Sequence, residues 1–252
     1  MIRLILIASL FVAGPVHAKR DKRARLTVKE QYELGLKYMN RGMYIKALDQ
    51  FNRVRNYHRD DPHSVKAELA IGDVYFKKNE WDQARLSYED FSRMHPRHPN
   101  LDYVIYQIGM TNFKKAPKAA GRDQTFTRHA LTSWTGFNSR FPESSHIAEV
   151  EGLADECRER LASKEVWIAR FYKRRAAWAA VERRAANMLS RYPDSSHAAL
   201  SIELIGEASA WQGNDKEAEM AVKKLEDSDP EAAKKLAQKL DRIKVKAAKP
   251  GR

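Results

Sequence analysis

The stretch LGLKYMNRGMYIKALDQF (residues 34–51) is matched 37 residues later by IGDVYFKKNEWDQARLSY (residues 71–88). Both carry a glycine near the start, an alanine near the end and aromatic residues at the same internal positions. The shared positions are Leu34, Gly35, Tyr38, Ala47 and Phe51 in the first stretch, and Ile71, Gly72, Tyr75, Ala84 and Tyr88 in the second. This spacing predicts paired helices joined by a tight turn, with small residues where the helices approach closely and aromatic side chains between them.

Weaker copies of the pattern continue along the chain. They run from Ile108 and Gly109 to Pro142, from Ile168 and Ala169 to Pro193, and from Gly206 to Pro230. Five partial matches resemble the tetratricopeptide repeat, an array of helix–turn–helix units of about 34 residues. We therefore predict an all-α fold, a tetratricopeptide-repeat solenoid of about five units with a C-terminal capping helix.

Two nearly identical stretches, RFPESSHIAE (residues 140–149) and RYPDSSHAAL (residues 191–200), separate consecutive units. Pro142 and Pro193 end the preceding helix, because proline cannot continue a helix and restricts the residue before it. The acid and serines that follow can accept hydrogen bonds from the first N–H groups of the next helix. A catalytic Glu143-Ser144 pair, as in some peptidoglycan-cleaving solenoid enzymes, is disfavoured because the equivalent pair in the second stretch has the same punctuating position.

Two segments depart from the repeat length. Residues 114–125 (KKAPKAAGRDQT) form a polar insertion in the third unit, which predicts an exposed loop. The unit between the prolines at 142 and 193 is too long, and its segment IAEVEGLADECRERLASKEVWIARFYKRR (residues 147–175) lacks a proline or other strong break. This segment is predicted to form one long helix or two nearly continuous helices. After Pro230, the apolar residues Leu236, Leu240 and Ile243 lie on one helical face, which favours a capping helix over a partner-binding one.

The first residues have the features of a secretory signal: Arg3, an apolar core and small residues at Val16 and Ala18. The box VAGP has the shape of a lipoprotein cleavage site, but Pro15 stands where the acylated cysteine would be, so no lipid anchor is predicted. We divide the chain into a signal peptide (1–18), a basic linker (19–26), the solenoid (27–230) and a capping helix with a basic tail (231–252). The lone Cys157 excludes an intrachain disulfide and is expected to be a buried helical residue.

Catalytic and cofactor-binding patterns are weak throughout. His95 and His98 lie between prolines in an inter-repeat turn, without a partner at metal-ligand spacing, so we predict no metal site. The sequence has no glycine-rich phosphate loop and no nucleophile elbow. We therefore predict a protein that is not an enzyme and has no cofactor.

Helical projection predicts a concave groove, because the first helix of each tetratricopeptide unit lines the concave face of the solenoid. The residues assigned to it are Tyr32, Leu36, Met39, Asn40, Leu69, Asp73, Phe76, Lys77, Tyr103, Tyr106, Met110 and Phe113. Aromatic and methionine side chains on an open surface are typical of peptide-binding grooves. The alternative is that some of them pack against the insertion or a neighbouring helix.

The charge is strongly positive, with 46 Lys and Arg against 33 Asp and Glu. Basic runs occur at residues 19–25, in the fourth unit and in the C-terminal tail. Such runs favour anionic lipid surfaces or acidic protein surfaces. Export argues against nucleic acid as a partner.

The second half resembles the BamD family through WIARFYKRRAAWAAVERRAANMLSRYPDSS, and residues 51–110 resemble that family's N-terminal half. The resemblance covers roughly residues 27–227. It implies a non-catalytic periplasmic scaffold in outer-membrane β-barrel assembly. Its N-terminal repeats would bind unfolded outer-membrane proteins, and its C-terminal repeats would bind the barrel-forming subunit. The docking candidates on this match are Tyr172, Arg174, Trp178 and Arg184, of which Trp178 is expected in the core and Arg184 is the stronger contact.

One departure from the family leaves two interpretations open. BamD proteins are normally lipoproteins with an acylated cysteine near the start, whereas this chain has Pro15 in the corresponding box. Either the chain associates peripherally with the outer membrane through its partner and basic N-terminus, or it is a soluble periplasmic coordinator of envelope or peptidoglycan assembly.

Overall fold

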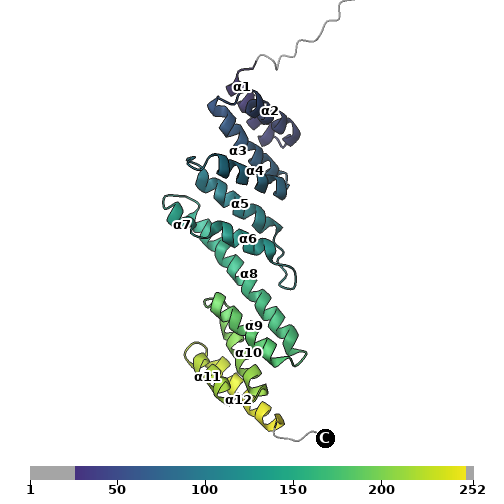
Figure 1. Cartoon of the computed structure of the whole chain (residues 1–252), viewed down its shortest axis with the longest axis vertical. Coiled ribbons are helices and arrows are strands. Elements are labelled where there is room, and N and C mark those ends of the chain that lie inside the picture. Colours follow the sequence, from purple (N-terminus) through teal and green to yellow (C-terminus); the bar gives the residue numbers. More distant parts are fainter. Residues whose placement is uncertain (1–25, 248–252) are drawn as a thin grey trace, which may run out of the picture. The chain divides into compact units, whose positions relative to one another are not determined.

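The structure, a computed structural model, describes residues 26–247, which form twelve α-helices and no strand (Figure 1). The predicted signal peptide, nearly all of the basic linker and the last five residues lie outside this range. The helices are α1 (Val28–Asn40), α2 (Tyr44–Tyr57), α3 (Pro62–Lys77), α4 (Trp81–Met94), α5 (Leu101–Lys115), α6 (Thr125–Trp134), α7 (Phe137–Arg140), α8 (Ile147–Lys173), α9 (Trp178–Arg191), α10 (Ala198–Trp211), α11 (Asp215–Glu226) and α12 (Pro230–Ala247). The all-α prediction is confirmed.

The chain divides into two compact units, residues 1–67 and 68–252, and the division falls within α3. The described part of the first unit consists of the hairpin α1–α2 and the first residues of α3. A capping box begins α1: Thr27 Oγ1 accepts a hydrogen bond from the Glu30 N–H at 3.2 Å, and Glu30 Oε2 accepts one from the Thr27 N–H at 2.8 Å. These bonds satisfy two backbone donors that no intrahelical carbonyl can reach.

Glycine opposite an aromatic ring defines the packing of three hairpins, α1–α2, α3–α4 and α5–α6. A Cβ atom on Gly35 would lie 2.6 Å from the Phe51 ring, and one on Gly72 would lie 2.7 Å from the Tyr88 ring. A Cβ on Gly109 would overlap Trp134 in the same way. The rings occupy the space where a side chain would stand, so the predicted close approach at the small residues is confirmed.

The turns inside four hairpins use one residue in the left-handed conformation. These residues are Gly42 (φ 70°), Asn79 (φ 61°), Ala176 (φ 52°) and Gly213 (φ 77°). Glycine adopts this conformation without steric cost, and asparagine tolerates it better than most residues. Ala176 is the exception, because its Cβ is strained there by about 1–2 kcal/mol.

The two proline-containing stretches separate helices as predicted. In the first, α7 ends at Arg140 and α8 begins at Ile147; in the second, α9 ends at Arg191 and α10 begins at Ala198. The first serine of each stretch accepts a 3.2 Å hydrogen bond from the N–H of the histidine before the helix, Ser144 from His146 and Ser195 from His197. Serine rather than the preceding acid therefore provides the local acceptor.

In the long unit, the segment before α9 forms one continuous helix, α8, of 27 residues. Figure 1 shows α6 along its first part and α9 along its second part, and both helices contact it. The extra length of this unit is thus taken up by one long helix, which is the first of the two predicted alternatives.

The polar insertion between α5 and α6 is less exposed than predicted. Gln124 is 1% exposed, and its Nε2 donates hydrogen bonds to the carbonyl oxygens of Pro117 and Ala119 at 3.2 and 3.1 Å. Lys164 of α8 donates 3.2 Å bonds to the carbonyl oxygens of Gly121 and Arg122. Backbone carbonyl groups of the loop therefore accept hydrogen bonds both from a side chain of the loop itself and from a side chain of α8.

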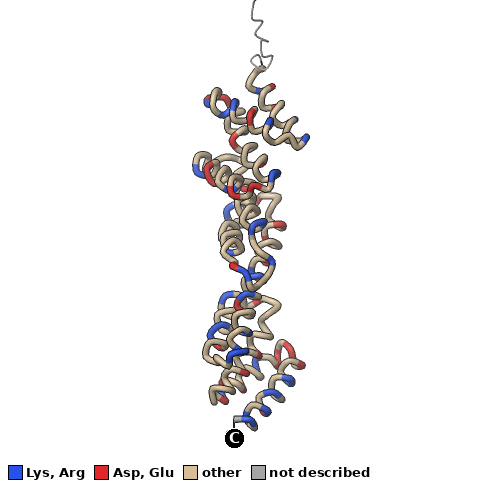
Figure 2. Tube along the Cα trace, turned by 90° about the vertical axis from the view of Figure 1, so that its right-hand side faces the viewer, with Lys and Arg blue, Asp and Glu red and all other residues tan. Residues whose placement is uncertain are grey.

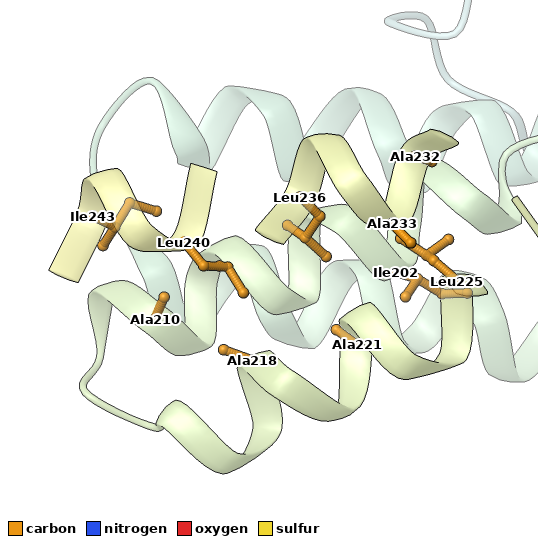
Figure 3. Close-up of a cluster of buried hydrophobic side chains, with 10 residues drawn as sticks. All are labelled: Ile202, Ala210, Ala218, Ala221, Leu225, Ala232, Ala233, Leu236, Leu240 and Ile243. Atoms are coloured by element: carbon orange, nitrogen blue, oxygen red, sulfur yellow. The ribbon is translucent and has the colours of Figure 1, made fainter. Parts of the chain in front are cut away.

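The last helix packs its apolar stripe on α10 and α11 (Figure 3). Leu236, Leu240 and Ile243 are each at most 5% exposed. We call this the C-terminal apolar cluster; its members are Ile202, Ala210, Ala218, Ala221, Leu225, Ala232, Ala233, Leu236, Leu240 and Ile243. Burying a leucine side chain of this kind stabilises a fold by about 1.5–3 kcal/mol.

Candidate functional site

Asp73, one of the predicted groove residues, is held inside the second unit by two tyrosines. Its Oδ1 accepts hydrogen bonds from the Tyr88 and Tyr103 hydroxyls, both at 2.8 Å, and Gln107 Nε2 donates to the Tyr103 oxygen at 3.0 Å. We call Asp73, Tyr88, Tyr103 and Gln107 the tyrosine–aspartate network. Burial raises the pKa of Asp73, and the two hydroxyl donors oppose that rise.

Tyr106 is also committed to internal contacts. It is 9% exposed, its ring stacks on His146 with centroids 4.5 Å apart, and its hydroxyl donates to Glu149 Oε1 at 2.7 Å. Burial raises the pKa of this hydroxyl, and the hydrogen bond to Glu149 adds to the effect. Leu69 is likewise buried. These two side chains therefore expose little surface to a peptide.

The other predicted groove residues of the second unit are half-buried or exposed. Phe76 is half-buried with its ring edge-on to Trp81 at 5.1 Å, and the following Lys77 is exposed. Phe113 lies under the Arg160 guanidinium, 4.4 Å from its central carbon. Met110 packs against the same cluster of buried residues as Tyr103 and Phe113. Of these residues only Lys77 is exposed, and the four apolar or aromatic side chains are half-buried.

In the first unit, the predicted groove residues lie on α1. Tyr32 is half-buried with its ring 5.6 Å from both Phe51 and His63. Leu36 and Met39 are half-buried, and Asn40 is exposed. The peptide-binding role of the twelve residues stays a prediction.

The candidate docking residues lie around the end of α8 and on α9. Arg184 Nη1 donates to Glu165 Oε2 at 3.2 Å, its side chain is 33% exposed, and its buried Nε has no hydrogen-bond partner among the described residues. Tyr172 is half-buried, and Arg174 is exposed at the end of α8. Sequence reasoning missed Glu165, because residues 19 positions apart on successive helices give no local signal of pairing.

Trp178 packs against the buried residues of the α8–α9–α10 cluster and stacks on Trp211, with centroids 5.4 Å apart and ring planes 7° apart. This arrangement places it between helices. Trp211, which the sequence analysis did not single out, is 36% exposed and extends the aromatic surface of Trp178 toward solvent.

Two neighbouring hollows follow one side of α8, and sequence reasoning did not find them. The first, about 450 Å³, is lined by residues of α6, α7 and α8, including Trp134 and Phe137. The second, about 490 Å³, is lined by α8 and the turn before α10, including Tyr192. Both are bordered by Asp155 and Arg158, which form an ion pair with each other. They arise where the long helix separates adjacent units.

The candidate reactive side chains His95 and Cys157 lie in internal surroundings. His95 Nε2 lies 2.7 Å from Glu68 Oε2, and residues 26–247 contain no group of three potential metal ligands. Cys157 is buried, and burial raises the pKa of its thiol to about 11. A thiol in that state is a poor nucleophile. None of the described helices is long and apolar enough to cross a membrane.

Comparison with known proteins shows the family to which the chain is similar. The family described as "Outer membrane lipoprotein" (YfiO) matches residues 24–225. The outer membrane protein assembly factor BamD of Neisseria gonorrhoeae is 25% identical over 221 residues, covering 81% of this chain and 83% of that protein. BamD of Xylella fastidiosa strain 9a5c is 25% identical over 238 residues, covering 90% and 82%. Among solved structures, the TPR2AB domain of yeast Sti1 has a TM-score of 0.46 at 14% identity, covering 88% of this chain and 98% of that one.

Proposed function

The chain belongs to the YfiO family, and we propose from this premise that it serves in the assembly of outer-membrane β-barrel proteins. As a member of this family it is a non-catalytic scaffold. The observation that carries the proposal is the match of both the family and the BamD proteins across most of the chain, which includes all the candidate docking residues.

Within this function, the C-terminal repeats bind the barrel-forming subunit through the region of Arg184. Its Nη1 is bonded to Glu165, while a third of the side chain is exposed. A guanidinium presents five donors in a planar fork, so Arg184 retains donors for a partner carboxylate. Arg174, exposed at the end of α8, adds a second cation to the same docking region.

The N-terminal repeats bind unfolded barrel substrates. The side chains that support this role in the second unit are Phe76 and Lys77, because they remain accessible while Asp73 and Tyr106 have internal partners. The half-buried ring of Phe76 suits the aromatic residues of a barrel C-terminal peptide, and the exposed cation of Lys77 suits its free carboxylate. We place the protein in the periplasm, peripherally associated with the outer membrane.

The docking role is tested with Arg184→Glu and the matched control Arg183→Glu. Arg183 is an exposed neighbour on α9, so both variants change the charge equally. We expect Arg184→Glu to weaken binding to the periplasmic domains of the barrel-forming subunit by at least about tenfold, since truncating one member of a hydrogen-bonded charge pair costs about 2–5 kcal/mol. Calorimetric titration measures both affinities, and equal affinities would remove Arg184 from the docking region.

The substrate role is tested with Phe76→Ala and Lys77→Glu. Binding of barrel C-terminal peptides, measured by fluorescence anisotropy, should fall for each variant. Tyr57→Ala provides a control, because this ring is 78% exposed and lies outside the predicted groove. Unchanged peptide affinity in both groove variants would contradict the assignment.

A second candidate function is supported by one observation, Pro15 in the box where a lipoprotein has its acylated cysteine. On that alternative the chain is a soluble periplasmic coordinator of envelope or peptidoglycan assembly. Fractionation separates the two: the coordinator is recovered with soluble periplasmic proteins, and the assembly factor is recovered with outer-membrane vesicles.

A further inference from the structure

The last three turns of α8 present an exposed face that neither the hairpin packing nor the proposed docking at Arg184 uses. Trp167 is 44% exposed on this face, which is unusual for the largest apolar side chain. Around it stand Lys164, Arg170, Phe171 and Arg175, and we call these five residues the tryptophan patch. The opposite face of the same segment, including Val166 and Ala169, is buried.

Each of the two aromatic rings of the patch is contacted by a cation. The rings of Trp167 and Phe171 are 6.3 Å apart with planes 20° apart. The Arg175 guanidinium carbon lies 3.7 Å from the Phe171 centroid, and Lys164 Nζ lies 5.1 Å from the Trp167 centroid. A Cβ on Gly121 would lie 3.2 Å from the Trp167 ring, so the loop backbone supports one side of the indole. The exposed tryptophan is therefore held in place.

Charge on the patch is positive and largely uncompensated. Within residues 26–247, no carboxylate forms an ion pair with Lys164, Arg170 or Arg175. Glu165, the acid on this part of α8, is bonded to Arg184 instead. Asp123, on the loop near Lys164, accepts a hydrogen bond from Thr125 and forms a 3.9 Å ion pair with Arg128, and the charge of Lys164 also acts on it without a direct ion pair. Lys and Arg positions recur along the C-terminal half of the chain in Figure 2.

Cations at the end of a helix are favoured by its dipole, which accounts for a preference for arginine there. The dipole does not account for an exposed tryptophan among them. Such a combination is favourable at the surface of an anionic membrane, where an indole ring sits among the headgroups and guanidinium groups bind phosphates. The two hollows along α8 are lined by residues outside the patch. The patch instead presents the exposed side chains of Trp167, Arg170 and Arg175, which suits a surface of anionic headgroups.

We propose that the tryptophan patch is a contact site for the anionic headgroups of a phospholipid membrane. Arg170 and Arg175 bind lipid phosphates, and Trp167 inserts its exposed ring at the headgroup level. Arg174, at the border of the patch, stays with the docking region. The inference is independent of which proteins the scaffold assembles, because vesicle binding is measured without them.

The test is co-sedimentation of the purified chain with vesicles of phosphatidylcholine alone or mixed with phosphatidylglycerol. The patch variant carries Trp167→Ala, Arg170→Gln and Arg175→Gln. The control carries Met220→Ala, Lys223→Gln and Lys224→Gln, which removes the same charge and an apolar side chain that is 60% exposed on α11. Thermal unfolding of both variants checks that the fold is intact.

We expect the wild-type chain to bind the anionic vesicles and to lose this binding at high salt. The patch variant should bind roughly 30-fold more weakly, which corresponds to about 2 kcal/mol for two cations near an anionic surface. The control should change by less than about threefold, through net charge alone. Equal binding by the patch variant and the wild type would overturn the proposal and locate the attraction elsewhere, including the basic run at residues 19–25.

A second measurement reads out the patch directly. Brominated phospholipids quench tryptophans at the membrane surface, and Trp167→Phe removes one of the five tryptophans while keeping an aromatic ring. We expect quenching in the wild type that is largely absent in Trp167→Phe. Equal quenching in both would overturn the insertion of Trp167. Preference for a soluble polyglutamate peptide over anionic vesicles would overturn the lipid assignment in favour of an acidic protein partner.

Discussion

The tyrosine–aspartate network and the C-terminal apolar cluster solve the same packing problem with different chemistry. In the first, Tyr88 fills the space beside Gly72 and must satisfy its hydroxyl with Asp73. In the second, Gly206 faces Ala221 and Leu236, which have no polar atoms to satisfy. The difference teaches that one repeat spacing permits either a large ring with a buried polar partner or small and branched aliphatic residues from an extra helix.

The largest effect is expected in the apolar cluster. Leu236→Ala removes a side chain that is 2% exposed and leaves a cavity between α12, α10 and α11. We expect a loss of about 2–5 kcal/mol in the free energy of unfolding. Urea denaturation measures it, with Val245→Ala as the control because that α12 side chain is 58% exposed. A loss below that of the control would show that α12 contributes little to the fold.

Removing one hydrogen bond from the tyrosine–aspartate network should lower the free energy of unfolding by less than Leu236→Ala does. Tyr88→Phe keeps the ring beside Gly72 but deletes one of the two donors to Asp73 Oδ1. We expect a loss of about 1–3 kcal/mol, because the buried carboxyl is left with one donor fewer. The comparison with Tyr75→Phe, whose hydroxyl has no part in the network, isolates this contribution. Equal stability of Tyr88→Phe and the wild type would contradict a structural role for the bond.

The network should also respond to pH, whereas the apolar cluster should not. Burial raises the pKa of Asp73, so between its unfolded and folded pKa values the native state binds more protons than the unfolded state. The contribution of Asp73 to stability is therefore present below the unfolded pKa and decreases as pH rises through the folded pKa. Asp73→Asn should remove this decrease, so the stability of wild type relative to Asp73→Asn should fall as pH rises from acid to neutral. A pH-independent difference in urea denaturation would contradict it.

Smaller effects are expected at the left-handed turns of two successive hairpins. Ala176→Gly should stabilise the chain by about 0.5–1 kcal/mol, because glycine relieves the strain at φ 52°. Gly213→Ala should destabilise it by about 1 kcal/mol at the equivalent turn, where φ is 77° and a Cβ meets no neighbour. Thermal unfolding distinguishes the two, and shifts in the same direction would refute the backbone explanation.

The smallest effect on stability is expected at Glu159 of α8, whose carboxylate accepts hydrogen bonds from the turn before α10. Burial raises its pKa, but hydrogen bonds from Ser196 and Ser195 outweigh that effect, so the pKa is lowered. Its contribution is present above the unfolded pKa and lost as pH falls through the folded pKa. Glu159→Gln should cost less than about 1 kcal/mol at neutral pH, because Glu159 is only half-buried and solvent screens its charge. The cost should disappear in acid, and a cost that persists there would assign the effect to packing.

The sequence predicted the helical hairpins because glycine, alanine and aromatic residues recur at a spacing that only paired helices explain. It also predicted the breaks at Pro142 and Pro193, where proline chemistry acts locally. It did not predict that Gln124 is buried, because a loop of polar residues gives no periodic signal. Periodicity alone therefore settles which segments are helical more reliably than how the connecting segments fold.

The candidate site was less predictable. Helical projection assigns a face to Tyr106, but it does not show that His146 and Glu149, about 40 residues later, cover that face. Helical projection also did not show that Glu165 pairs with Arg184, because the two residues lie on different helices. The exposure of a residue on the first helix of a unit depends on which side chains of the following unit cover it. Those contacts form only when the repeats pack together.

The proposed binding of the barrel-forming subunit through Arg184 can be tested directly. The most direct measurement is affinity purification of the tagged chain from its own envelope, in the wild type and in Arg184→Glu, with bound proteins identified by mass spectrometry. We expect a stoichiometric outer-membrane barrel protein with periplasmic domains in the wild type and much less of it in the variant. Recovery of soluble peptidoglycan-associated proteins, with no such barrel protein, would contradict the account.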